Sequence, residues 1–134
     1  MLGEQLGEES GKITGRRVIR SGAGGPRVED SFQSTGKIAG AAYRGIGTYW
    51  AAMRTGGFLY GEGQGVMMTK DGDGIMWVGQ GTGRFKPEGG VRWRGAVYYE
   101  TASQKLARLN GMAVLFEHET DADDNLSTKF WEWK

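Results

Sequence analysis

The run YGEGQGVMMTKDGDGIMWVGQGTGRF occupies residues 60–85 and decides the fold. Glycine alternates with other residues on both sides of a central KDGDG segment, at 61, 63 and 65 and again at 79, 81 and 83. Residues two apart in a strand lie on one face of a sheet. Because KDGDG has the composition of a turn, the run predicts a β-hairpin in which one face of both strands is almost free of side chains.

The same pattern continues into the neighbouring segments. Gly45 and Gly47 precede the hairpin and Gly95 follows it, and the turns TGG and PEGG separate these strands from the hairpin. Long strands joined by short turns indicate a meander. The predicted strands are residues 12–20, 28–35, 43–54, 58–69, 75–86, 91–101, 112–119 and 126–133.

Eight strands are the number at which an up-and-down sheet closes into a small barrel. We therefore predict an all-β fold, a single eight-stranded antiparallel up-and-down barrel. Residues 103–110 (SQKLARLN) give one short helical turn before the penultimate strand. The length of 134 residues predicts one domain, residues 11–134, preceded by a mobile, polar N-terminal tail at residues 1–10.

The loop lengths predict how the central strands pair. A three-residue loop after Arg54 places Tyr49 opposite Gly63, and a turn centred on Gly72 places Gly63 opposite Gly81. This register puts every charged residue of these strands on one face. The uncharged face is expected to line the lumen, because burying an unpaired charge is costly.

The opposite face carries charged residues and also large apolar ones, among them Trp50, Met76 and Val78. Apolar side chains on neighbouring strands suggest a subunit interface. We therefore expect a homo-oligomer.

Composition excludes several classes of function. The formal charge of +1 gives no electrostatic footprint for nucleic acid or an anionic membrane, and neither partner is expected. Without cysteine there is no thiol catalysis and no thiolate metal site. The glycine runs are followed by strands and not by a helix, so they do not predict a dinucleotide cofactor. The polar first residues lack the pattern of a signal peptide, which makes the cytoplasm the expected compartment.

Large aromatic side chains dominate the uncharged face. We expect them either to pack as a core or to form the walls of a ligand pocket. The candidate wall residues are Tyr49, Trp77, Trp93, Tyr99 and Phe116.

His118 is the only histidine and shares a face with Phe116. Its ordinary pKa lies near neutrality, which makes it the candidate general acid or base, although a hydrogen-bonded structural role is the commoner one. Glu132 on the last strand is a candidate partner if its side chain points inward. No metal site is expected, because the acidic turn at residues 121–125 lacks the glycine of a calcium loop.

Residues 60–85 and the segment ASQKLARLNGMAVLFE (102–117) resemble the allene oxide cyclase barrel superfamily, in particular its small uncharacterised prokaryotic members. In such relatives a short helical turn and an L-x-G step precede the penultimate strand. The resemblance implies the barrel over roughly residues 11–133. The plant enzymes cyclise a fatty-acid epoxide with a buried carboxylate and an ordered water. The predicted lumen of the four central strands contains no carboxylate, so only the fold is carried over.

The sequence therefore predicts binding of a small apolar molecule in the barrel lumen. One alternative is a cofactor-free isomerase or cyclase that uses His118 and Glu132 for proton transfer. Another is a structural, oligomeric module with a filled core.

Overall fold

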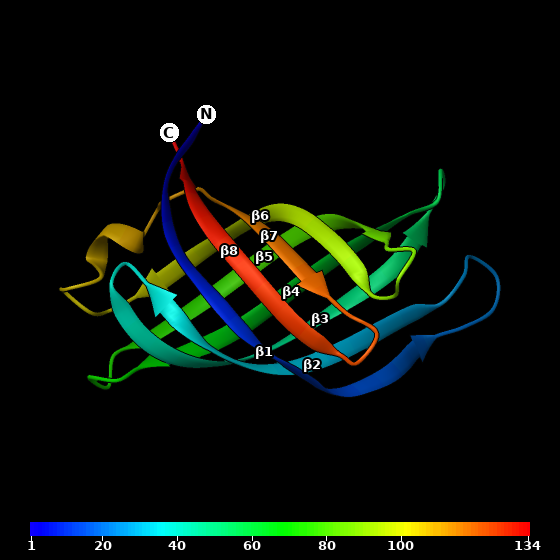
Figure 1. Cartoon of the computed structure of the whole chain (residues 1–134), viewed down its shortest axis with the longest axis horizontal. Helices are drawn as coiled ribbons and strands as arrows, with labels where there is room; N and C mark the ends of the chain where they lie inside the picture. The colour runs from blue at the N-terminus through cyan, green and yellow to red at the C-terminus, as the bar shows by residue number, and fades with distance from the viewer.

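The computed structural model describes residues 1–134 and is a closed barrel of eight strands. Each strand pairs antiparallel with the next along the chain, and β8 returns to pair with β1 (Figure 1). The predicted fold class is confirmed, including the single helical turn before β7. The elements are β1 (Leu2–Arg20), β2 (Arg27–Ile38), β3 (Ala41–Arg54), β4 (Phe58–Thr69), β5 (Gly74–Phe85), β6 (Val91–Thr101), η1 (Ala107–Leu109), β7 (Val114–Thr120) and β8 (Asn125–Trp133).

The first ten residues are not a tail, and this prediction is wrong. Residues 2–10 form the first half of β1, where Gly7 pairs with Ile38 of β2 on one side and with Phe130 of β8 on the other. Leu6 is buried in the core. Without these residues β8 would have an unpaired edge, so closing the barrel requires the segment that looked like a polar tail.

The register of the central strands agrees with the prediction in part. Tyr49 lies opposite Gly63, as predicted. Gly63 lies opposite Gly79 and not Gly81, because the β4–β5 turn is centred one residue earlier, on Asp71. A displacement of two residues keeps every side chain on its face, so the predicted lumen is unchanged.

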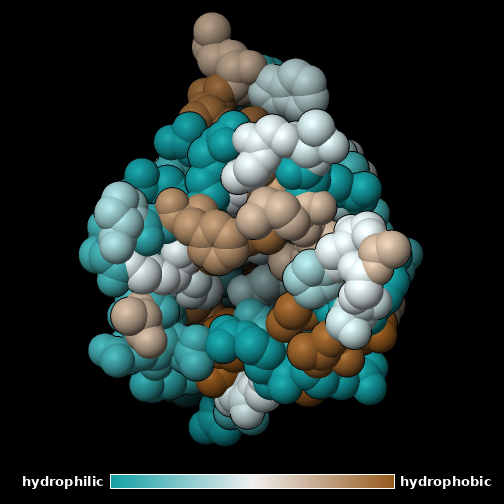
Figure 2. All heavy atoms as spheres, turned by 90° about the vertical axis from the view of Figure 1, so that its right-hand side faces the viewer, coloured by the Kyte–Doolittle hydropathy of each residue, from teal (hydrophilic) through white to brown (hydrophobic).

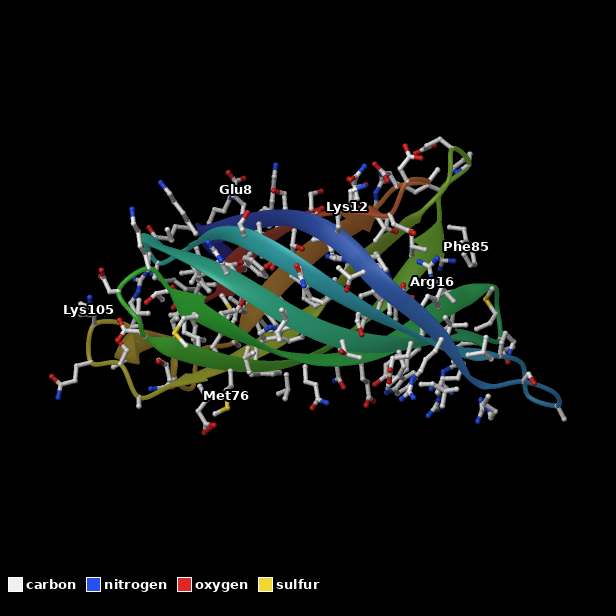
Figure 3. All side chains as sticks on the ribbon, turned by 90° about the horizontal axis from the view of Figure 1, so that it is seen from below. Glu8, Lys12, Arg16, Met76, Phe85 and Lys105 are labelled. Carbon is white, nitrogen blue, oxygen red and sulfur yellow. The ribbon has the colours of Figure 1, made fainter.

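The charged side chains of the central strands β3 to β6 accordingly lie on the outer face of the barrel. Figure 3 shows Glu8, Lys12 and Lys105 projecting outward, together with the apolar Met76. At one end the β1–β2 hairpin extends beyond the other strands (Figure 1). Figure 2 views that end and shows hydrophilic and hydrophobic atoms mixed around a central depression. No helix of the chain is long and apolar enough to cross a membrane.

The lumen glycines provide space for aromatic rings. A Cβ atom on Gly47 would come within 2.8 Å of the Trp77 ring, and one on Gly65 would collide with the same indole. A Cβ atom on Gly83 would lie 2.8 Å from the Trp93 ring. Real Cβ atoms do not approach so closely. The space over these glycines is therefore filled by the indole rings, which pack directly on the glycine backbone. We call this surface the glycine floor.

The end of the barrel away from the β1–β2 hairpin is filled by a packed core. Ile38, Ile75, Leu109 and Val114 are fully buried there. The side-chain amide of Asn110 bonds the backbone of Thr101 at both its N–H (2.8 Å) and its carbonyl (2.9 Å). This pair of bonds holds η1 against β6. The cavity described below adjoins this core in the middle of the barrel.

Candidate functional site

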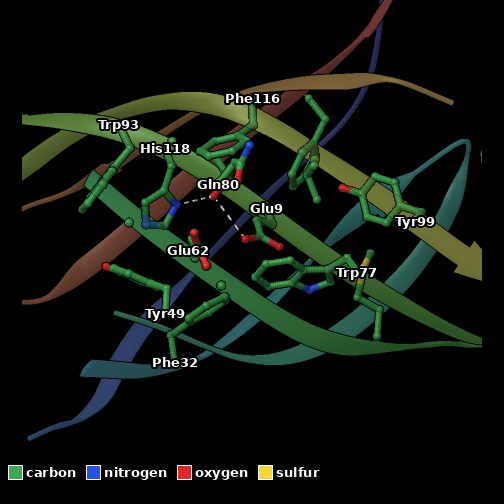
Figure 4. A pocket seen from close by; sticks show the side chains of 18 residues that line it. Glu9, Phe32, Tyr49, Glu62, Trp77, Gln80, Trp93, Tyr99, Phe116 and His118 are labelled. Atoms are coloured by element: carbon green, nitrogen blue, oxygen red, sulfur yellow. Dashed lines mark hydrogen bonds between the residues drawn. The ribbon is translucent and has the colours of Figure 1, made fainter. Parts of the chain in front are cut away.

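A cavity of ≈ 90 Å³ lies in the lumen beside the glycine floor. The structure places all five predicted wall residues around it, and Figure 4 shows their rings turned inward. Phe32 of β2 and Phe130 of β8 complete the aromatic wall. The predicted wall residues that line the cavity are Tyr49, Trp77, Trp93, Tyr99 and Phe116.

His118 projects from β7 into this cavity and is only 8% exposed. Its Nδ1 atom lies 2.7 Å from the hydroxyl oxygen of Thr128, which is directly opposite on β8. Its Nε2 atom is buried and has no hydrogen-bond partner in the protein. Burial lowers the pKa of His118 to about 4, so the imidazole is neutral at physiological pH.

Aromatic rings fix the orientation of this imidazole. The Tyr49 ring meets it edge to face at a centroid separation of 5.9 Å, and the Phe32 ring lies 6.4 Å away. Tyr49 also packs edge to face against Trp93 at 5.9 Å. Such edge contacts favour one arrangement of the rings over others. The imidazole is therefore held in place on the side of the cavity where Tyr49 and Trp93 lie (Figure 4).

The structure does not bring Glu132 to His118. Glu132 pairs with Val114 near the end of β8, and its carboxylate lies 3.9 Å from the Lys134 ammonium. It does not line the cavity. The β8 residue opposite His118 is Thr128, four residues earlier, so Glu132 is too far along the strand to act as its partner.

A carboxylate does reach the cavity, and it belongs to Glu9 of β1. Its Oε1 atom accepts hydrogen bonds from the hydroxyls of Tyr43 (2.6 Å) and Ser34 (3.2 Å). Its Oε2 atom accepts one from Thr128 (3.1 Å). Burial raises the pKa of Glu9, and the three hydroxyl donors act against that rise.

Sequence reasoning missed Glu9 because its segment was assigned to a tail. A signal was nevertheless present. Gly7, Glu9, Gly11 and Ile13 are spaced two apart, which is the same alternation of glycine that marks the central strands. A carboxylate flanked by glycines in that alternation lies on the lumen face.

Together these residues form one hydrogen-bonded chain across the strands. It runs from Glu9 through Thr128 to His118, drawn as dashed lines in Figure 4. The chain ends at a neutral imidazole whose other nitrogen, Nε2, is buried and donates or accepts according to the tautomer. No cluster of three or more potential metal ligands occurs in the protein.

Comparisons with known proteins identify the fold. No protein-family model matches the chain, and no curated protein matches its sequence. Among solved structures, a protein of unknown function from Clostridium acetobutylicum is similar over 98% of each chain, with a TM-score of 0.84 and 14% identity. A β-barrel-like protein from Acinetobacter baumannii matches all of this chain and 96% of its own, with a TM-score of 0.83 and 16% identity.

An enzyme from Penicillium herquei is also similar, with a TM-score of 0.71 and 13% identity over 96% of this chain and 92% of its own. At these identities the likeness concerns the fold alone. The chain thus shares its barrel with uncharacterised bacterial proteins and with one fungal enzyme.

Proposed function

We propose that the protein binds a small, largely apolar molecule in the barrel lumen. The observation that carries this proposal is the cavity itself, an aromatic-walled space lined by His118, whose fully buried Nε2 atom has no hydrogen-bond partner in the protein. Ligand pockets are typically apolar with a few placed polar groups. A core that served only for packing would have no reason to leave a buried nitrogen without a partner.

The size of the cavity limits the ligand. An engineered cavity of about 150 Å³ in another protein accommodates benzene. The space here is ≈ 90 Å³, so a molecule of about four to five non-hydrogen atoms is the expected occupant. Larger molecules would require the aromatic walls to move.

A cofactor-free isomerase or cyclase is the second candidate. The observation that favours it is the hydrogen-bonded chain, in which Glu9 takes the role that was expected of Glu132. The lowered pKa of His118, about 4, makes its imidazole a weak base, whereas efficient proton transfer needs a pKa near the working pH. Binding is therefore the better-supported function.

The relationship to allene oxide cyclase is likewise a proposal. It is supported by the closed barrel, by the helical turn before β7 and by the buried carboxylate of Glu9. A fatty-acid epoxide is far larger than the cavity, so we do not extend that substrate to this chain. One protein with this fold is an enzyme, but the likeness concerns the fold and assigns no chemistry to this chain.

The test is native mass spectrometry of protein purified from its own cells, with gentle release of bound molecules. A retained apolar compound, one per chain, would support the proposal and identify its class. A matched pair of variants sharpens the result. Gly79→Ala places a methyl group in the cavity wall, whereas Gly74→Ala on the same strand meets no neighbouring atom.

We expect Gly79→Ala to retain markedly less of the compound than wild type and Gly74→Ala to retain as much. If both variants hold it equally, the compound is bound elsewhere. An empty wild-type protein would favour a structural module with a filled core.

A further inference from the structure

The unpartnered Nε2 atom of His118 carries more information than its presence in the cavity. A histidine nitrogen donates or accepts according to the tautomer, which the hydrogen bond at the other nitrogen sets. Here that bond runs from Nδ1 to Thr128, which also bonds Glu9. The direction of each bond in this chain can be worked out from the carboxylate end.

Glu9 accepts hydrogen bonds from three hydroxyl groups, those of Tyr43, Ser34 and Thr128. An ionised carboxylate only accepts, and three hydroxyl donors match it. The Tyr43 hydroxyl keeps its proton, because burial and the neighbouring Glu9 raise its pKa. The single proton of the Thr128 hydroxyl is therefore directed at Glu9.

A hydroxyl has one proton to donate. Since Thr128 gives its proton to Glu9, its oxygen can only accept at the His118 side. Nδ1 of His118 must then carry the hydrogen, and Nε2 must present a lone pair. The imidazole is locked as the Nδ1–H tautomer, and its buried Nε2 is an acceptor without a partner in the protein.

The three residues of this hydrogen-bonded chain that line the cavity, Glu9, Thr128 and His118, therefore offer only acceptors to a ligand. The carboxylate of Glu9 also disfavours a second negative charge nearby, which excludes carboxylic acids in their ionised form. We propose that the barrel recognises a neutral, compact molecule through one N–H or O–H group that donates to His118 Nε2. This inference rests on the proposed lumen-binding function.

The tautomer can be measured without any ligand. Because the chain has one histidine, the imidazole nitrogens of labelled protein give a single set of long-range 1H–15N correlations. We expect Nδ1 to have the shift of a protonated nitrogen and Nε2 that of an unprotonated one. The reverse pattern would mean that Glu9 is protonated and donates toward Thr128, and it would overturn the proposal.

Recognition can be tested with pyrrole and furan. The two five-membered rings have nearly the same shape, but pyrrole offers an N–H donor where furan has an oxygen. We expect pyrrole to bind roughly five- to tenfold more tightly, as one additional hydrogen bond allows. Its binding should move the Nε2 resonance of His118.

The outcomes separate the two proposals. Equal binding, or tighter binding of furan, would overturn donor recognition and leave lumen binding intact. If neither compound binds up to its solubility limit, lumen binding of molecules of this size is wrong, and donor recognition is wrong with it.

Two threonine variants provide a further check. Thr128→Val keeps the shape of the side chain but removes the oxygen that accepts from His118 Nδ1. We expect the tautomer to change and the preference for pyrrole over furan to fall to one or below. Thr82→Val, at an exposed position on β5, should keep the wild-type preference. A preference unchanged in Thr128→Val would contradict the proposed chain.

Discussion

Burial of Glu9 and His118 makes the stability of the protein depend on pH. The two residues respond to pH in opposite directions. The folded-state pKa of His118 is lowered, so the unfolded chain binds its proton first as pH falls. The folded-state pKa of Glu9 is raised. Its contribution to the free energy of unfolding therefore decreases as pH rises above the ordinary glutamate range.

The contribution of His118 to stability is expected to be lost between its ordinary pKa of 6.5 and its folded-state pKa of about 4. Above 6.5 both states are neutral and no penalty arises. Between pH 7 and pH 5 the wild type should therefore lose about 2 kcal/mol more unfolding free energy than His118→Phe. Urea denaturation at the two pH values measures this difference. Parallel losses in the two proteins would show that His118 is not buried in its neutral form.

The glycine floor gives a second prediction for single residues. Gly65→Ala forces a methyl group into the Trp77 indole and toward the carbonyl of Ile46. We expect it to reduce the free energy of unfolding by about 1–3 kcal/mol, the usual cost of overpacking. Gly74→Ala should be close to neutral, since nothing lies within 4 Å of its added methyl. Equal stability of the two variants in urea would argue against the packing of the Trp77 indole on Gly65.

At the scale of the strands, the sequence predicts best where alternation is strong. The glycines of β3 to β6 specify strands, a lumen face and the ring-bearing positions, and all of these are confirmed. The first half of β1 was missed because its acidic residues outweighed the weaker alternation of Gly7 and Gly11. The misplaced partner Glu132 has a related cause. Which β8 residue meets His118 depends on the β7–β8 register, which no glycine pattern marks.

Amide hydrogen exchange tests the structured start of the chain. The backbone of residues 7–12 pairs with both β2 and β8. We expect these amides to be protected to a degree similar to those of β8, because both belong to the closed ladder. A mobile segment would exchange within the dead time of the experiment. That result would mean that the N-terminal residues are mobile after all and that Glu9 does not belong to the site.

The whole molecule presents one apolar face to its surroundings. Ile46, Val66 and Met76 lie side by side on β3, β4 and β5 and are each about half exposed. Arg44 on β3 and Glu100 on β6 stand at opposite edges of this face. A second copy related by a twofold axis parallel to the strands would cover the apolar row. The same rotation would place each arginine near the glutamate of the other copy.

We therefore expect a homo-oligomer built on this face. Light scattering at micromolar concentration should give a mass above that of one chain, and Met76→Lys should lower it to the monomer. Phe85→Lys changes an equally exposed apolar residue at the end of β5 and should leave the mass unchanged. A wild-type protein that is monomeric would refute the interface.

The packing of the indole rings on glycine backbone also affects how fast a ligand can enter or leave the lumen. A ring that lies against side chains can swing to another rotamer and open a path, but Trp77 and Trp93 lie against the strands themselves. A path past either ring then requires the indole to leave the backbone on which it packs, because the strand behind it cannot yield without breaking ladder hydrogen bonds. Exchange of a bound molecule should accordingly be slow in both directions, with a residence time set by the displacement of a packed ring.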